Sequence, residues 1–331
     1  MTDLRLPATR VGLGPVGLVL LAMLAFSIQD VVVKILAEQV SLWQLQFLRS
    51  LLTLWLLVMV VAVSGHISSL ASAGWFWPLV RAVFMCGAYL SFYASLPMLP
   101  LSKAAAAFFT GPLMITLLAA LLLGEPIGPR RIMAVIIGFV GVLFIIRPGA
   151  AGWNPVALLP VVSAFCYATG VVITRWRCQG ERNVALSMVH NLLYAGIGLW
   201  GIVLLELWPA PMATRIELPF LTSSWIELGA IAGGLILFTA MTHLVGVLSS
   251  VRAYQMEDAS RIAPFEYSYL AIMPVYDVVF WGNWPEPLTL LGMGLITLAG
   301  VFVAWREGRP ARPQVHPRGE QPWTPDGENA D

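Results

Sequence analysis

Long apolar runs recur through most of the 331-residue sequence, and they constrain the fold more than any other feature. A run of about 20 apolar residues spans the hydrocarbon core of a bilayer as an α-helix. Charged residues, Pro and Gly divide the sequence into ten such runs, at 14–37, 43–64, 76–97, 103–123, 131–147, 155–175, 187–207, 226–249, 260–281 and 288–305. Only 11% of the residues are charged and 58% are hydrophobic, so most of the chain is expected to contact lipid. The sequence therefore predicts an all-α integral membrane protein with ten transmembrane helices.

Positive charges between these runs predict the orientation of the chain. Counted on alternate sides of the membrane, thirteen Lys and Arg residues fall on the side of the N-terminus and four on the other. Because cytoplasmic loops carry the excess of positive charge, we expect a multi-pass protein with both termini in the cytoplasm. The thirteen are Arg5, Arg10, Arg130, Arg131, Arg175, Arg177, Arg182, Arg252, Arg261, Arg306, Arg309, Arg312 and Arg318, and the four are Lys34, Lys103, Arg147 and Arg215.

The two ends of the chain lie outside the apolar runs. We expect residues 1–13 to form a cytoplasmic N-terminus. The run that follows is too long for a secretory signal peptide, and nine more runs come after it, so it is expected to stay as an anchor. Residues 308–331 contain five prolines and few large apolar residues, which predicts a disordered cytoplasmic tail.

The sequence contains an internal repeat. The segments SKAAAAFFTG and SRIAPFEYSY lie 158 residues apart, and the same offset pairs Gly124 with Gly282. Each half contains five runs, and because five is odd, the second half is expected to enter the membrane from the opposite side. The predicted domains are a first five-helix repeat at 14–149 and a second at 150–307. Inverted repeats are typical of secondary transporters, whose halves rock about a site near the bilayer midplane.

Several sequence motifs lie within residues 14–307. Pro112 precedes an LLAALLLGE segment, a GFVGVLFIIRPG segment ends at Gly149, and APFEY begins at Ala263. These motifs resemble the ten-helix drug/metabolite transporter superfamily, with two copies of its EamA-type five-helix domain. Within the superfamily, QDVVVK ending at Lys34 and APFEYSYL are most similar to the bacterial branch that includes S-adenosylmethionine and riboflavin importers.

The resemblance implies a function and a cellular location. It implies a secondary transporter that moves a small organic metabolite across the bacterial inner membrane by alternating access, with riboflavin or S-adenosylmethionine as candidate cargo. Members also export amino acids and other metabolites, so an exporter is the alternative. One departure is that the second copy has Gly282 and Asn283 where the repeat pattern expects Gly-Glu, which puts in doubt a role for that carboxylate in both halves. The expected partners are the metabolite and the lipid bilayer, without cofactor or nucleic acid, and a homodimer is considered as an assembly.

Ionisable residues lie inside the first predicted helix. Ser27, Asp30 and Lys34 recur at spacings of three and four and therefore share one face. Ionisable groups inside a span cost about 2.5–3.5 kcal/mol each, so they are candidates for function. Two interpretations stay open: Asp30 and Lys34 line the transport site, or they form an intrahelical pair near the outer interface.

A polar stripe marks the ninth predicted helix. Glu266, Tyr269, Met273, Tyr276 and Asp277 share a face at helical spacing, and such a stripe lines either a cavity or a contact with another helix. Glu266 is the predicted proton-coupling residue, because burial favours the neutral form of a carboxyl group and so permits reversible protonation. The alternative is that Glu266 pairs with an arginine and holds the two halves together.

Arg49 and aromatic residues complete the predicted substrate site. Arg49 is either a counter-ion for a substrate carboxylate or phosphate-like group, or a side chain that snorkels to the interface. Aromatic residues on the third and fourth runs offer flat surfaces for a ring-bearing substrate, although aromatic stripes also pack ordinary helix contacts. The predicted substrate-binding residues are Asp30, Lys34, Arg49, Tyr89, Tyr93, Phe108, Glu266, Tyr269 and Tyr276, and no catalytic or metal site is predicted.

Prolines and glycines predict where the helices break and pack. Pro112, Pro264 and Pro274 are expected to interrupt the fourth and ninth runs, and the repeat nearly superimposes Pro112 on Pro264. Breaks at matching positions in two halves of a transporter point to its transport site. Gly229 and Gly233 form a GxxxG pair, which predicts close approach of the eighth run to a neighbouring helix.

An integral-membrane enzyme is the main rival class of protein. The sequence contains no GxSxG, HExxH or GxxxxGK[ST] motif, each of which would supply a nucleophile, a metal site or a nucleotide loop. His190 and His243 lie in apolar runs without a Cys, Asp or Glu at ligand spacing, so we interpret them as hydrogen-bonded interior residues. The sequence therefore favours a transporter over an enzyme.

Overall fold

The computed structural model describes residues 14–64, 74–124, 128–149, 154–256 and 265–307. This part of the chain is helical throughout and contains no strand. The predicted cytoplasmic N-terminus, the predicted disordered tail and Pro264 lie outside the described residues.

Seven helices in the described segments are long and apolar enough to cross a membrane. They lie at Pro15–Leu36, Leu42–Val63, Phe76–Ser95, Leu101–Leu123, Pro155–Arg177, Asn183–Leu207 and Ala230–Ala253. Three shorter apolar helices lie in the remaining predicted runs, at Ile132–Ile146, Ser268–Trp281 and Pro287–Phe302. The chain is therefore an integral membrane protein built from α-helices.

The helical elements follow the predicted runs closely, with two short additions. The longer elements are α1 (Pro15–Leu36), α2 (Leu42–Ser64), α3 (Phe76–Ser95), α4 (Leu101–Phe108), α5 (Gly111–Leu123), α6 (Pro129–Ile146), α7 (Leu159–Arg177), α8 (Asn183–Leu207), α11 (Ala230–Met256), α13 (Ser268–Trp281) and α14 (Pro287–Glu307). A 3₁₀ turn at Pro155–Leu158 leads into α7. The sequence did not predict α9 (Met212–Glu217) and α10 (Pro219–Thr222), which lie between α8 and α11.

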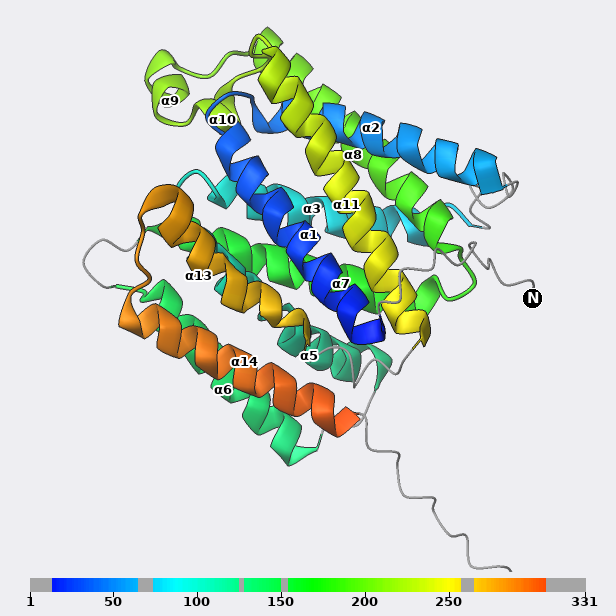
Figure 1. Cartoon of the computed structure of the whole chain (residues 1–331), viewed down its shortest axis with the longest axis vertical. Coiled ribbons are helices and arrows are strands. Elements are labelled where there is room, and N and C mark those ends of the chain that lie inside the picture. Colours follow the sequence, from blue (N-terminus) through cyan, green and yellow to red (C-terminus); the bar gives the residue numbers. More distant parts are fainter. Residues whose placement is uncertain (1–13, 65–73, 125–127, 150–153, 257–264, 308–331) are drawn as a thin grey trace, which may run out of the picture.

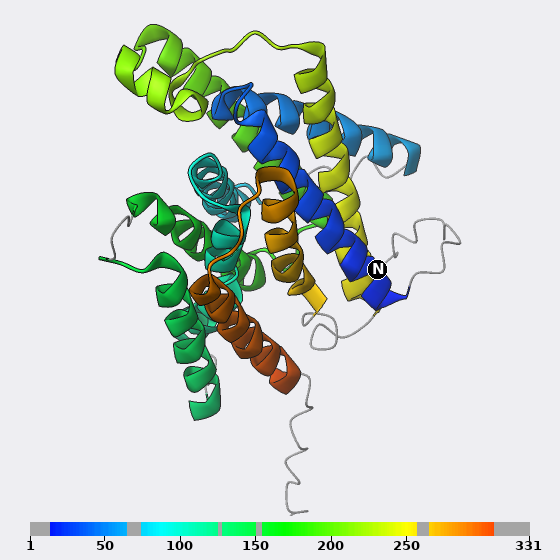
Figure 2. The ribbon, with the colours of Figure 1, turned by 60° about the vertical axis from the view of Figure 1, so that its left-hand side comes forward.

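The long helices pack in four pairs. α1 runs along α11, α3 along α7, α2 along α8, and α6 along α14. Figure 1 shows α6 and α14 at one end of the molecule and α2 with α8 at the other, and Figure 2 shows α1 beside α11. α13 contacts both α1 and α4, so it joins the α1/α11 pair to the rest of the molecule.

Glycines permit close backbone approach within two of these pairs. A Cβ atom on Gly141 of α6 would lie 2.8 Å from the carbonyl oxygen of Gly292 on α14, and one on Gly198 of α8 would lie 2.7 Å from the backbone nitrogen of Phe47 on α2. Small residues at such contacts are typical of membrane helices. The predicted contact at Gly229 and Gly233 is wrong, because a Cβ atom on Gly229 would meet nothing within 4 Å and one on Gly233 would meet only Leu228, at 3.7 Å.

The fourth and ninth predicted helices are each interrupted by a turn. α4 ends at Phe108, and after a turn at Phe109 and Thr110 the chain continues as α5, with Pro112 in its first turn, where a missing N–H is tolerated. Residues 265–266 are helical, Tyr267 forms a turn, and α13 follows. The predicted interruption at Pro274 is wrong, because α13 continues through this residue. The break in the fourth helix therefore lies just before Pro112.

Buried carboxylate oxygens of α13 cap the N-terminus of α4. The backbone N–H groups of Leu101 and Ser102 donate to the Asp277 carboxylate at 2.8 and 2.7 Å. The first N–H groups of a helix have no partner within it, so this contact satisfies two of them. Asp277 on the predicted polar stripe thus makes a helix contact.

Candidate functional site

The two interrupted helices meet in the interior of the molecule. The ring of Phe109 lies 5.4 Å from the ring of Tyr267 and stacks on Tyr269 at a centroid distance of 5.3 Å. Each of these three residues lies at or beside a helix break. Unwound backbone at membrane depth occurs where protein buries it or where it lines a cavity, so the contact places both breaks in a protein-lined interior.

Asp30 lies beside these breaks and is 7% exposed. Its carboxylate accepts a short hydrogen bond from the Tyr269 hydroxyl, and the Gln29 side-chain amide lies 3.5 Å from its other oxygen. The same Gln29 nitrogen donates to the Tyr93 hydroxyl at 2.8 Å. Asp30 therefore connects α1 with α13 directly and with α3 through Gln29.

Arg49 of α2 is buried, with 5% of its surface exposed. Its guanidinium donates to the Tyr93 hydroxyl and to the Gln46 side-chain oxygen, both at 2.8 Å. Tyr93 thus accepts from both Gln29 and Arg49, so a chain of hydrogen bonds runs from the Asp30 carboxylate to the Arg49 guanidinium. The snorkelling interpretation of Arg49 is wrong, because the charged end points into the protein.

Aromatic rings surround the Arg49 guanidinium. Its central carbon lies 5.0 Å from the ring centre of Tyr93, 5.7 Å from Tyr89 and 5.8 Å from Tyr194. The Tyr89 ring also lies within 6.2 Å of the rings of His190 and His243, centroid to centroid. These distances are those of cation–π and aromatic pair contacts. Helices α3, α8 and α11 therefore supply an aromatic shell for a cation on α2.

Several buried polar atoms in and around this cluster have no hydrogen-bond partner among the described residues. They are the side-chain oxygen of Gln29, the side-chain nitrogen of Gln46, the hydroxyls of Ser50 and Tyr194, and Nδ1 of His243. Most buried polar atoms of native proteins are paired, so an accumulation like this one calls for a specific explanation. Gln29 and Tyr194 were not predicted as site residues, because amides and single tyrosines in apolar runs carry no spacing signal.

Four of the predicted substrate-binding residues lie outside the Arg49 cluster: Lys34, Phe108, Tyr276 and Glu266. Lys34 donates to the Leu99 carbonyl at 2.6 Å and lies 4.8 Å from the ring centre of Trp281. The predicted intrahelical pair of Asp30 and Lys34 is therefore wrong. Asp30 bonds Tyr269 on α13, whereas Lys34 bonds the connection between α3 and α4.

Phe108 and Tyr276 make aromatic and apolar packing contacts. Phe108 lies 5.4 Å from the ring of Phe92 and 5.5 Å from that of Tyr167, and Tyr276 packs against Phe280 at 6.0 Å. The cluster instead unites Asp30, Arg49, Tyr89, Tyr93 and Tyr269.

Glu266, the predicted proton-coupling residue, is half-buried and precedes the turn at Tyr267. It interacts electrostatically with Tyr167 of α7 and with Tyr267. It therefore lies on the far side of the helix break from the contact between Asp30 and Tyr269.

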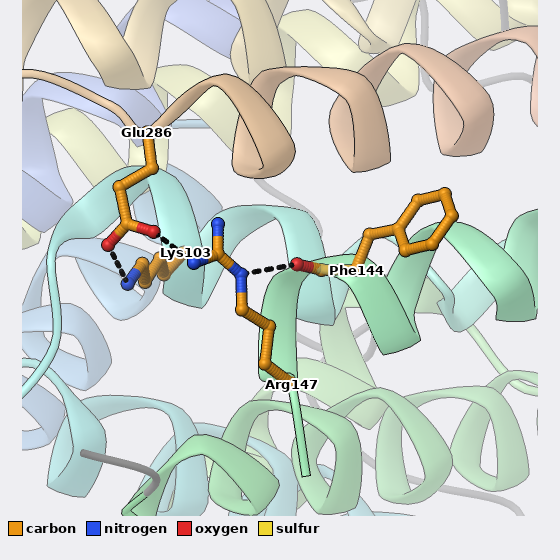
Figure 3. Close-up of polar contacts among 4 residues, drawn as sticks. All are labelled: Lys103, Phe144, Arg147 and Glu286. Atoms are coloured by element: carbon orange, nitrogen blue, oxygen red, sulfur yellow. Dashed lines mark hydrogen bonds and ion pairs between the residues drawn. The ribbon is translucent and has the colours of Figure 1, made fainter. Parts of the chain in front are cut away.

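A second charged group lies at the ends of the helices (Figure 3). Glu286, just before α14, binds Lys103 of α4 at 3.2 Å and Arg147 at the end of α6 at 2.5 Å. The Nε–H of Arg147 also donates to the Phe144 carbonyl at 3.2 Å. Lys103 holds the pKa of the Glu286 carboxyl below its usual range, chiefly through their hydrogen bond. This contact, which we call the Glu286 network, links the first half of the chain to the second.

Metal-ligating side chains do not gather in the described segments. No group of three or more His, Cys, Asp or Glu side chains there could hold a metal ion. His190 has the sulfur of Cys86 3.8 Å from its Nδ1 and lies beside Tyr89. Both interior histidines therefore belong to the aromatic shell.

Comparison with known proteins gives consistent matches. Residues 14–147 match the EamA-like transporter family. A protein of Rhizobium johnstonii named riboflavin transporter is 30% identical over 234 residues, which covers 71% of this chain and 72% of that protein. A Rickettsia bellii protein named S-adenosylmethionine uptake transporter is 26% identical over 292 residues, covering 88% of this chain and 94% of that protein.

A solved crystal structure also shares this fold. It superimposes with a TM-score of 0.58 and covers 89% of this chain and 99% of the other, at 14% sequence identity. At that identity the likeness concerns the fold alone.

Proposed function

Because the chain belongs to the EamA-like transporter family, we propose that it carries a small organic metabolite across the bacterial inner membrane by alternating access. The family and its relatives make it a membrane metabolite transporter of the drug/metabolite transporter superfamily, in the branch of S-adenosylmethionine and riboflavin transporters. Its mechanism, its cargo and its orientation are the parts that we propose.

Two inverted five-helix halves are the first part of the proposal, and the pairing of helices supports it. In the proposed repeat, α1 of the first half corresponds to α7 of the second, and α3 corresponds to α11. Exchange of the two halves therefore places the α1/α11 pair on the α7/α3 pair. α2 corresponds to α8 and α6 to α14, so the exchange places each of these two pairs on itself. This is the packing that a pseudo-two-fold axis between two repeats generates.

Matched backbone features give the repeat further support. The turn at Phe109 and the turn at Tyr267 are related by the same offset of 158 residues as Gly124 and Gly282. Both glycines end their helices in the left-handed conformation, with φ of 68° and 66°. Matching helix breaks that meet in the interior are where a transporter of this design binds its cargo.

The orientation rests on the charges between the helices. Thirteen Lys and Arg residues on one side and four on the other support cytoplasmic termini. Reporter fusions after Asn154 and after Gln179 are expected to report opposite sides of the membrane. The same side for both would remove the crossing by α7 and with it the inverted repeat.

The cargo is the second part of the proposal, and the buried cluster of Arg49, Tyr93, Asp30 and Tyr269 carries it. Two opposite charges and several rings inside a membrane protein suit an organic solute with a ring or with both charges. Riboflavin and S-adenosylmethionine are the candidate cargoes, because relatives of this chain are named riboflavin transporter and S-adenosylmethionine uptake transporter. Export of an amino acid or another metabolite is the alternative.

Exchange in proteoliposomes tests this function. The purified chain is expected to accelerate the exchange of labelled S-adenosylmethionine or riboflavin against the same unlabelled compound, which a membrane enzyme or structural protein does not do. Cells unable to make the compound should then grow on an external supply. Resistance to an amino-acid analogue without such growth would favour export instead. Assembly as a homodimer stays a prediction, and light scattering in detergent measures it.

Proton coupling through Glu266 is the third part of the proposal. A half-buried carboxylate next to a helix break supports it, because its surroundings change when the two halves move. Glu266→Gln keeps the size of the side chain but cannot release a proton. The variant is expected to exchange cargo at equal concentrations while losing the response of uptake to a pH gradient. Normal gradient-driven uptake would refute the coupling role, and loss of folding would favour a structural pair.

A further inference from the structure

Hydrogen-bond donors without acceptors gather on the α2/α8 pair. Two of the five N–H groups of Arg49 donate to Tyr93 and Gln46, and the other three have no partner within the described segments. The side-chain nitrogen of Gln46 and the hydroxyls of Ser50 and Tyr194 are also unpartnered, and these three residues are at most 1% exposed. Arg49 and Ser50 lie three and four residues after Gln46 and therefore share its face of α2, and Tyr194 lies across from Arg49 on α8. We call these four residues the donor set.

Hydrogen-bond acceptors gather on the neighbouring α1/α11 pair. The side-chain oxygen of Gln29 is unpartnered, and Gln29 lies next to the Asp30 carboxylate. Nδ1 of His243 on α11 is also unpartnered and accepts in one tautomer of the ring. We call Gln29, Asp30 and His243 the acceptor set.

Tyr89 lies between the two sets. Its ring centre is 5.7 Å from the Arg49 guanidinium carbon, 6.0 Å from the ring centre of Tyr194 and 6.2 Å from that of His243. Arg49 and Tyr194 of the donor set and His243 of the acceptor set thus lie around one ring, on two different helix pairs. A buried polar atom without a partner is unfavourable, and a ligand that supplies the missing partners removes that penalty.

The two sets require different chemical groups. A permanent cation with free N–H groups, surrounded by neutral donors, suits an acceptor with negative charge, and a carboxylate matches the guanidinium fork with two parallel bonds. The acceptor set, with its own carboxylate, suits an ammonium or another cationic group, and the surrounding tyrosine rings favour a cation as well. Riboflavin has no carboxylate, whereas S-adenosylmethionine carries a carboxylate, an ammonium and a sulfonium.

We propose that the donor set binds the carboxylate of a zwitterionic cargo of the amino-acid class, while the acceptor set receives its cationic group. The inference rests on the proposed transport function and names the cargo class of the same site. It selects the amino-acid end of S-adenosylmethionine over a neutral flavin.

The test compares two ligands that differ only by the carboxylate. Proteoliposomes with the full chain exchange labelled S-adenosylmethionine, and unlabelled S-adenosylmethionine and decarboxylated S-adenosylmethionine compete with the label. Loss of the carboxylate is expected to weaken competition by at least about tenfold, the effect of one or more charge-assisted hydrogen bonds. Parallel proteoliposomes measure the exchange of labelled riboflavin.

Tyr194→Phe distinguishes ligand binding from packing. The variant keeps the ring and removes a hydroxyl that has no partner, so the ligand-free protein should unfold at the same or a higher temperature. Competition by S-adenosylmethionine should weaken about three- to tenfold, and competition by the decarboxylated compound should not change. Thr289→Val is the matched control, because it removes a buried, unpartnered hydroxyl on α14, outside the donor and acceptor sets, and should leave both competitions unchanged.

Each outcome decides the inference separately from the transport function. Equal competition by both compounds overturns it, and so does an unchanged affinity in Tyr194→Phe, which would assign the unpartnered atoms to ordered water only. Exchange of riboflavin without S-adenosylmethionine overturns it but leaves the transporter intact. If neither compound is exchanged, the two named cargoes are excluded, and thermal stabilisation of the protein by each of the twenty amino acids becomes the test. Stabilisation that Tyr194→Phe weakens would support the inference. The absence of any stabilisation would overturn it.

Discussion

Two groups of charged side chains in the described segments differ in burial. Arg49 and Asp30 are 5% and 7% exposed and are joined through neutral hydrogen-bonding residues of α1 and α3. In the Glu286 network, the side chains of Lys103, Arg147 and Glu286 are 31%, 33% and 47% exposed and touch each other directly. The exposed charges are therefore paired directly, whereas the buried ones are held apart by neutral groups.

The difference shows what each group can contribute. Exposed ion pairs are screened by water and salt and contribute about 0–1 kcal/mol each. A charge inside the membrane region costs about 2.5–3.5 kcal/mol, so it is retained only where partners or a ligand compensate it. We therefore expect the buried cluster to determine what the protein binds, and the Glu286 network to affect only the packing at one end of the molecule.

The largest expected effect separates the two groups directly. Arg49→Gln is expected to reduce cargo exchange by about 100-fold or more, since truncating a buried charge that binds a ligand costs about 3 kcal/mol or more. Arg147→Gln, the matched change in the Glu286 network, should alter exchange by less than about threefold. Initial exchange rates in proteoliposomes measure both, normalised to protein that elutes as a single folded species. Similar losses in the two variants would contradict the distinction.

A smaller effect is expected for the stability of the buried cluster. Tyr269→Phe keeps the ring that stacks on Phe109 but removes the hydroxyl that donates to Asp30, leaving a buried carboxylate with a lost partner. The free energy of unfolding should fall by about 1–2 kcal/mol. Tyr194→Phe removes an unpartnered hydroxyl and should cause no loss. Thermal unfolding followed by the fluorescence of the 13 tryptophans compares the two, and equal melting temperatures would refute the role of the Tyr269 bond.

The smallest effect is expected in the Glu286 network and depends on pH. The pKa of the Glu286 carboxyl in the folded protein lies below the usual value of about 4.3. The network therefore stabilises the protein at pH values above the pKa that this carboxyl has in the unfolded chain. That stabilisation is lost as pH falls through the lowered folded value. The melting temperatures of the unmodified chain and of Glu286→Gln should differ slightly at pH 7 and converge near pH 3, and 1 M salt should reduce the difference at pH 7. A difference that grows in acid would contradict this sign.

Much of the fold could be predicted because hydropathy is a local property. A helix in lipid satisfies its backbone hydrogen bonds within itself, so an apolar run of sufficient length specifies a helix without knowledge of its neighbours. The long helices lie in the predicted runs for this reason. The small α9 and α10 have no comparable signal, and their loop is held by contacts from α2, such as Trp43 donating to the Leu221 carbonyl at 2.9 Å.

The site could be predicted only in part. Asp30, Arg49 and Tyr269 were detectable because polar groups inside apolar runs are rare and expensive. Gln29 was missed because it lies beside Asp30 in sequence and only the position of Tyr93 shows that it belongs to the cluster. Whether the cluster binds cargo stays a prediction, which the exchange experiments decide.

The sequence by itself determined the long helices and the residues that carry charge into their apolar runs. Only the tertiary structure decided which of these charges meet. Asp30 and Lys34 share a helix face, yet one bonds Tyr269 and the other bonds Leu99, because α1 passes different neighbours at the two levels. A buried polar side chain takes its partner from whichever helix packs beside it, and that choice depends on the packing of the whole helix bundle.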